Sequence, residues 1–151
     1  MRVSSQLQSQ LFSKYVVAEI LYKLDRTSWM KKYNAHDLTI QAWATGIWVK
    51  QAGTFISYKD LNNYLREVAG AIGEMLPVEP VSTGWLVSSQ QDFSKKYFVT
   101  CSKSAGWECD CMKYRCWRNR IPKELPQFWQ VIGGRPYCHH IAAAYSARIK
   151  A

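Results

Sequence analysis

The sequence predicts an α+β protein in which a helical N-terminal part precedes a small ββα module stabilised by a metal ion. Apolar residues recur at helical spacing through the first half of the chain. The residues after Gly84 favour strands instead, and two pairs of Cys and His residues follow them. With 48% apolar and 14% aromatic residues, the 151-residue chain has enough core-forming side chains for one domain or two small ones.

Three helices are expected in residues 1–84, because apolar side chains return every three or four positions. Ser57 and Asp60 have the spacing of a capping box, in the looser form with Asp at the third helical position. The expected helices span residues 4–24, from Asn34 or Asp37 to Gly53, and from Ser57 to about Gly70.

The second and third of these helices could form a helix-turn-helix, but Lys59 and Arg66 are the only basic residues on the presumed recognition helix. Core packing or a partner-binding face is therefore the favoured role for Trp29, Trp43 and Trp48. A protein partner is expected to bind through these N-terminal helices.

The boundary between the two parts is placed at Gly84, because the stretch from Gly73 to Gly84 contains two prolines and cannot continue a helix. The expected domains are thus residues 1–84 and 85–151. The second should contain strands over residues 85–89 and 97–102, an extended piece over 107–111 and a C-terminal helix after Pro136.

The second part carries the residues of a predicted metal site. Cys109 and Cys111 form a Cys-x-Cys pair, and Cys138 and His140 form a Cys-x-His pair after a spacer of 26 residues, Met112–Tyr137. Three thiolates and one imidazole form a complete tetrahedral ligand set for one structural Zn²⁺. Such a closed site would connect sheet to helix and perform no chemistry.

This ordering of hairpin, Cys-x-Cys, Cys-x-His and apolar helix resembles a SWIM-type zinc finger over roughly residues 85–151. The resemblance implies a ββα core in which Cys109, Cys111, Cys138 and His140 are the zinc ligands. It also implies a module that binds DNA or another protein.

Three alternatives for the ligand set remain open. Cys116 lies in the spacer and could displace one ligand, and His139 could replace His140. An all-thiolate iron–sulfur site would use Cys109, Cys111, Cys116 and Cys138, although Cys-x-Cys is an uncommon spacing for a cluster. Cys101 and Cys116 could also be ordinary thiols.

The basic and aromatic residues of the spacer predict a surface that contacts nucleic acid. The formal net charge of +9 divides at Gly84 into +2 (nine Lys/Arg, seven Asp/Glu) and +7 (eleven Lys/Arg, four Asp/Glu). Basic side chains bind phosphates and aromatic rings stack on bases. The alternative is a solvated basic loop whose aromatic rings pack back onto the finger. The expected contact residues are Lys113, Arg115, Trp117, Arg118, Arg120, Lys123 and Arg135.

These features predict a zinc-dependent, non-catalytic protein that binds nucleic acid, with DNA favoured over RNA. The other hypothesis is an adaptor that docks on a helicase, recombinase or transposase-like partner. No catalytic Ser-His-Asp order, phosphate loop or carboxylate pair is found in the sequence, and an enzyme using the thiol of Cys101 or Cys116 is the least favoured class. The sequence contains no apolar run long enough to span a membrane and no export signal, so a cytoplasmic, nucleoid or nuclear location is expected.

Overall fold

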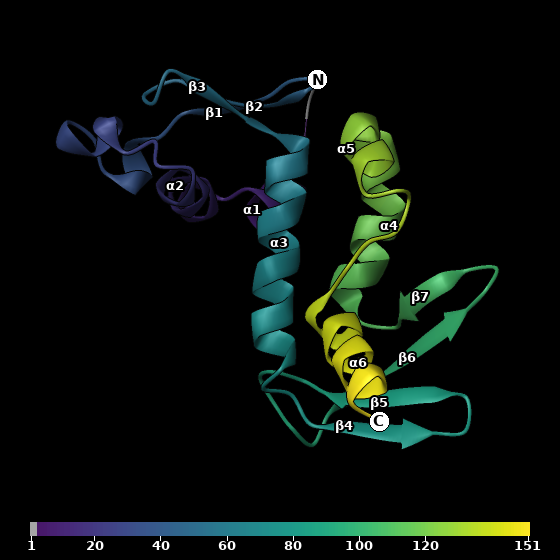
Figure 1. The fold of residues 1–151 in the computed structure, drawn as a ribbon. Helices are drawn as coiled ribbons and strands as arrows, with labels where there is room; N and C mark the ends of the chain where they lie inside the picture. The colour runs from purple at the N-terminus through teal and green to yellow at the C-terminus, as the bar shows by residue number, and fades with distance from the viewer. Residues whose placement is uncertain (1–2) are drawn as a thin grey trace. The chain divides into compact units, whose positions relative to one another are not determined.

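The computed structural model describes residues 3–151 and shows an α+β protein (Figure 1). The chain forms two compact units. The first comprises residues 1–64 and 120–134, and the second comprises residues 65–119 and 135–151. Neither unit is a continuous stretch of sequence, because the chain passes from the first unit to the second and back, and two of the divisions fall inside helices. The sequence-based boundary at Gly84 lies within the second unit.

The first unit begins with two short helices, α1 (Ser5–Leu11) and α2 (Lys14–Lys23), where the sequence predicted one helix over residues 4–24. The prediction missed the interruption at Ser13. The Ser13 Oγ accepts a hydrogen bond from the backbone N–H of Val16 at 3.3 Å and so caps α2. The apolar spacing continues across this interruption, which explains why periodicity alone joined the two helices.

A three-stranded antiparallel sheet follows the short 3₁₀ helices η1 (Ser28–Lys31) and η2 (Ala35–Asp37). The prediction of a second helix here was wrong, and the helix-turn-helix that depended on it is excluded. The sheet has the order β1-β2-β3 and pairs Trp48 with Phe55. Its strands are β1 (Ile40–Ala42), β2 (Gly46–Val49) and β3 (Thr54–Ser57).

The third predicted helix is confirmed as α3 (Tyr58–Gly73), which begins directly after β3. The Ser57 Oγ accepts a hydrogen bond from the backbone N–H of Asp60 at 3.1 Å, as expected for a capping residue. α3 belongs to the first unit up to Tyr64 and to the second from Leu65 onward.

Large aliphatic and aromatic side chains form the core of the first unit. The edge-to-face pair of Tyr58 and Phe128, with ring centroids 5.6 Å apart, shows that α5 (Pro126–Val131) belongs to this core. The fully buried residues of the first unit include Leu7, Leu11, Phe12, Leu21, Leu38, Ile47, Ile56, Tyr58, Leu61, Ile121, Leu125 and Phe128.

The second unit contains a four-stranded antiparallel sheet in the order β4-β5-β6-β7. The predicted hairpin is confirmed, and β7 matches the expected extended piece. The sequence missed β4, which contains Pro80 and lies at the edge of the sheet, where a strand tolerates proline. The strands are β4 (Val78–Val81), β5 (Gly84–Ser88), β6 (Lys96–Ser102) and β7 (Gly106–Cys109).

Helices occupy the spacer and the C-terminal segment. The spacer begins with α4 (Met112–Glu124), and the predicted C-terminal helix is confirmed as α6 (His139–Lys150), which packs across the four-stranded sheet (Figure 1). α6 also lies close against the end of α3, because a Cβ at Gly73 would meet the Ala143 nitrogen and the His139 oxygen at 2.8 Å. Among residues 3–151, no helix has both the length and the apolar character needed to cross a membrane.

Candidate metal centre and basic helix

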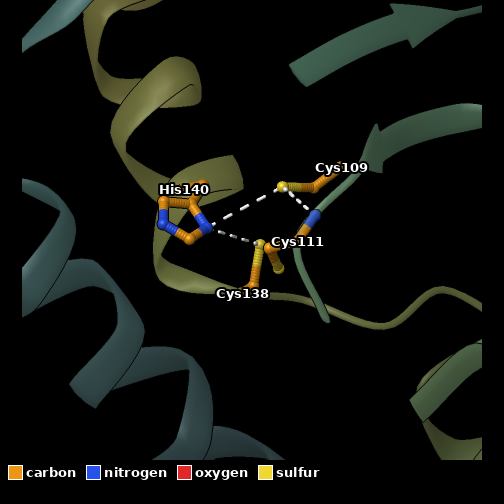
Figure 2. Close-up of side chains that lie close together, drawn as sticks. All are labelled: Cys109, Cys111, Cys138 and His140. Carbon is orange, nitrogen blue, oxygen red and sulfur yellow. Dashed lines mark hydrogen bonds between the residues drawn. The ribbon is translucent and has the colours of Figure 1, made fainter. Parts of the chain in front are cut away.

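Four side chains of the second unit converge on one point (Figure 2). They are Cys109 at the end of β7, Cys111 in the connection that follows, Cys138 immediately before α6 and His140 in the first turn of α6. Their ligand atoms all lie within 4.8 Å of one another, and all four residues are buried. This buried group of three thiols and one imidazole could hold a single metal ion.

The distances within the cluster fit a tetrahedral site. The Nδ1 atom of His140 lies 3.8 Å from the Cys109 sulfur and 3.9 Å from the Cys138 sulfur. Zinc–sulfur bonds of about 2.3 Å and zinc–nitrogen bonds of about 2.0 Å place neighbouring ligand atoms roughly 3.5–3.8 Å apart. A contraction of at most about 1 Å would therefore bring the four ligand atoms to the corners of a zinc tetrahedron.

The local fold supplies hydrogen bonds to the sulfur atoms. The backbone N–H of Cys111 donates to the Cys109 sulfur, and that of Tyr114 donates to the Cys111 sulfur, each at 3.4 Å. Cys111 thus accepts from the first turn of α4 as a serine or threonine cap would. Cys138 is the N-cap residue of α6. Two helix N-termini are therefore placed beside sulfur atoms, where their partial positive charge favours the thiolate form.

The thiols of the cluster differ in their protonation in the absence of a metal. Hydrogen bonds from Cys109 and Cys138 lower the pKa of Cys111, so Cys111 is the thiolate of the group. The pKa of Cys109 is raised far above the ordinary range by the hydrogen bond from Cys109 to Cys111. A hydrogen bond with Cys109 lowers the pKa of Cys138, but the hydrogen bond to Cys111, burial and the charge of Cys111 together outweigh it and raise this pKa to about 12.

His140 uses one ring nitrogen toward the sulfur atoms and leaves the other free. Within the described residues, its buried Nε2 atom has no hydrogen-bond partner. The ring is instead fixed by its neighbours, with ring centroids 4.6 Å from Tyr97 and 4.2 Å from His139. The orientation with Nδ1 toward the three sulfurs is therefore held by packing.

The alternative ligands do not join this group. Cys116 lies on α4, half-buried, and the structure does not place it with the four converging side chains. His139 is also outside the group, and burial lowers its pKa to about 4, so its ring is neutral at pH 7. Cys101 is exposed on β6.

The predicted nucleic-acid residues are distributed over both units. Arg120 and Lys123, in the last turns of α4, belong to the first unit, and Arg120 donates a hydrogen bond to the Ser4 Oγ at 3.3 Å. In the second unit, Arg115, Arg118 and Arg135 are exposed. Successive helix residues are rotated by about 100°, so Arg115 and Arg118 lie on the same side of α4, about 60° apart.

Two of the predicted contact residues are not exposed. Trp117 is only 3% exposed, so its ring offers no face on which a base could stack, contrary to the prediction. The ammonium of Lys113 lies 4.7 Å from the centroid of this ring, and burial lowers the pKa of Lys113. Tyr114 is buried as well, and its hydroxyl donates to the Trp107 carbonyl. The aromatic residues of the spacer therefore pack within the protein, as the alternative interpretation expected.

The structural units share the positive charge almost equally. The first unit has ten Lys/Arg and five Asp/Glu, a net of +5, and the second has ten Lys/Arg and six Asp/Glu, a net of +4. The division at Gly84 had assigned most of the charge to the metal-binding part. The difference arises because Arg120 and Lys123 of the spacer belong to the first unit, whereas Glu67, Glu74 and Glu79 belong to the second.

The backbone N–H groups of Cys111 and Tyr114, which donate to the sulfur atoms, were not predicted from the sequence. Cys111 stands directly before α4, at the position of a capping serine or threonine, but no helix was predicted there and the cap became visible only in the structure. Comparison of the chain with protein-family models, curated proteins and solved structures gives no match. The chemistry of the site itself is therefore the basis on which a function can be proposed.

Proposed function

We propose that this protein binds one structural Zn²⁺ and uses the metal-stabilised unit to bind nucleic acid without catalysing a reaction. The observation that supports zinc is the buried group of Cys109, Cys111, Cys138 and His140, with its interatomic distances near those of a tetrahedral site. Four protein ligands leave no open position for a water or a substrate, which favours a structural role. We further propose that the unit is a SWIM-like zinc finger, in which the ion stabilises the joined ends of β7 and α6.

Nucleic-acid binding is supported by the position of the exposed arginines relative to the cluster. Cys111 caps α4, and Arg115 and Arg118 follow in the next two turns of the same helix. The Arg118 guanidinium lies 3.4 Å from a Glu108 oxygen, but both side chains are partly exposed and the pair is easily exchanged for a phosphate. Arginine contacts to the backbone would give affinity with little sequence selectivity.

The test combines metal analysis with salt-dependent binding. Purified protein should contain one zinc per chain. Its affinity for a labelled DNA duplex, followed by fluorescence anisotropy, should fall steeply between about 50 and 200 mM salt. The double variant Arg115→Ala/Arg118→Ala should retain zinc, bind about tenfold or more weakly, and lower the salt slope by about 2.

The matched control is Lys95→Ala/Lys150→Ala, which removes the same charge from exposed positions of the same unit. Equal loss in both double variants would mean that only net charge matters, and would contradict a specific role for α4. Protein isolated without stoichiometric metal would contradict the zinc proposal.

A second candidate function is the protein-interaction adaptor. It is supported by a groove of about 370 Å³ in the second unit, between the end of α3 and α6. Tyr145 and Ile149 line this groove and are 48% and 63% exposed, respectively. Exposed apolar side chains beside a groove are typical of a surface that receives a partner. Absence of nucleic-acid binding at low salt, with zinc present, would favour this function.

A further inference from the structure

The outer face of the three-stranded sheet in the first unit carries three aromatic rings. Side chains alternate between the two faces of a strand, and here the alternation is strict. Ile47, Val49 and Ile56 point into the core and are 0% exposed. Trp48 and Phe55, which are directly opposite each other on β2 and β3, point away from it.

Trp43, immediately after β1, completes this aromatic face. Its ring centroid lies 4.9 Å from Phe55 and 6.4 Å from Trp48, and the centroids of Trp48 and Phe55 are 5.0 Å apart. Trp43 is 45% exposed and Phe55 is 36% exposed, while Trp48 is half-buried between them. A cross-strand aromatic pair stabilises a sheet by only about 0.2–1 kcal/mol, so three large rings gathered on the solvent side also point to a ligand.

The surroundings of the aromatic face are basic. Residues 38–59 contain two lysines and no acidic residue, and Lys50, which is exposed, lies in the turn directly after β2, two positions from Trp48. Arg26 lies beside β3, an edge strand of the sheet. Its guanidinium donates hydrogen bonds to the Phe55 carbonyl at 2.7 Å and the Thr54 Oγ1 at 3.1 Å. Both bonds use the same guanidinium nitrogen, so Arg26 retains further N–H groups.

A polar cleft of about 540 Å³ lies along this edge. Thr54 lines the cleft and its neighbour Phe55 points to the opposite, aromatic face, so the two features meet at the edge strand β3. The lining includes one acidic residue, Asp25, whose carboxylate would repel a phosphate. A phosphate would therefore bind near Arg26 and Lys31. The cleft is lined by Asp25, Arg26, Thr27, Ser28, Trp29, Lys31, Ala52 and Thr54.

We propose that this surface binds single-stranded nucleic acid, with bases stacked on Trp43, Trp48 and Phe55 and phosphates in the cleft beside Arg26 and Lys31. The inference rests on the proposed nucleic-acid function and adds to it a second binding surface, in the first unit, with its own class of ligand. Aromatic faces beside cations are the usual means of binding single strands, because every base offers a flat ring and every linkage a negative charge. A duplex keeps its bases stacked on one another, so its base faces are not available to these rings.

The experiment compares two ligands on the full-length, zinc-loaded protein. A labelled oligothymidylate of about 20 nucleotides and a duplex of equal length are titrated by anisotropy. Trp43→Ala and Phe55→Ala should each weaken single-strand binding about tenfold or more and leave duplex binding within about twofold. Trp43→Phe should recover most of the affinity, because it restores an aromatic face.

Tyr15→Ala and Tyr22→Ala are the matched controls, because these rings of α2 are 71% and 68% exposed in the same unit. They should bind both ligands as the unmodified protein does. Thermal unfolding of each variant shows whether the first unit remains folded. If Trp43→Ala is unstable, the single-strand affinities of Trp43→Phe and Phe55→Ala test the stacking instead.

Several outcomes would overturn the inference. Unchanged single-strand affinity in the Trp43 and Phe55 variants, together with weaker binding in Arg115→Ala/Arg118→Ala, would remove this site and leave the proposed function in place. Equal losses for single strand and duplex would also contradict stacking. A dimer that Phe55→Ala dissociates would show that the face joins two copies of the chain. Binding of neither ligand at about 50 mM salt would remove the proposed function and the inference together.

Discussion

The two units of this protein have hydrophobic cores of different composition. The core of the first consists of leucine, isoleucine and large aromatic side chains contributed by helices, the three-stranded sheet and α5. The core of the second is smaller and contains two alanines and three cysteines, grouped as Leu76, Val87, Val99, Cys109, Cys111, Tyr114, Cys138, Ile141, Ala143 and Ala144. Burial of apolar area stabilises the first unit, whereas the second would depend on metal–ligand bonds.

Removal of the metal should give the largest difference between the units. Chelation, or the substitution Cys109→Ser, should unfold the second unit, because metal binding to such sites contributes on the order of 10 kcal/mol to folding. Amide hydrogen exchange should show loss of protection in β5, β6 and α6 while α2 and β2 remain protected. Cys101→Ser is the control, since this exposed thiol lies outside the cluster. Simultaneous loss of protection in both units would contradict the comparison.

A core substitution in the first unit should have the opposite pattern. Phe128→Ala removes a ring that is 1% exposed and packed against Tyr58, and should lower the free energy of unfolding of this unit by about 3–5 kcal/mol. The zinc content should remain unchanged. Val131→Ala, at a residue of the same helix that is 44% exposed, should have little effect. The measurement is denaturant unfolding with parallel metal analysis.

Zinc binding by the second unit should strengthen as pH rises. Cys109 and Cys138 have raised pKa values and are protonated at pH 7 without metal, whereas the lowered pKa of Cys111 leaves it as thiolate. Binding therefore releases about two protons, which corresponds to about 2.7 kcal/mol per pH unit. Calorimetric titration in buffers of different ionisation enthalpy measures this release. Release of fewer than one proton would show that the thiols are already ionised.

The smallest predicted effect concerns two glycines of α3 that belong to the second unit. At Gly73 an added Cβ would lie 2.8 Å from two backbone atoms of α6, so Gly73→Ala should lower the free energy of unfolding by about 1–3 kcal/mol. At Gly70 an added Cβ has no heavy atom of the described chain within 4 Å apart from the helix's own backbone, and alanine should stabilise by roughly 0.5–1 kcal/mol. Thermal unfolding of the zinc-loaded protein compares the pair. Equal shifts would contradict the close packing of α3 on α6.

The candidate metal site could be found from sequence because its chemistry is local. Ligand type and short spacing, as in Cys109 and Cys111, predict a site without knowledge of the fold. The hairpin of β5 and β6 was also predictable, since its strands are rich in residues that favour extended structure. Whether zinc and nucleic acid are bound stays a prediction.

The sheet of the first unit could not be found in the same way. Helical spacing separates the apolar residues Ile40, Trp43 and Ile47, although β1 and β2 are only three and four residues long. Such short strands give too few alternations to compete with that pattern. Likewise, the exposed face of Trp43 and the buried position of Trp117 depend on tertiary packing, which composition does not reveal.

Gly46 has a consequence for how the first unit reaches its fold. It pairs with Ser57, and a Cβ at this position would collide with the Ile56 carbonyl of the neighbouring strand. A slip of β2 by one residue would bring a bulky side chain into that contact and would turn Ile47 and Val49 toward water. The single hydrogen atom at Gly46 therefore allows one alignment of the hairpin and penalises its nearest misfolded alternative.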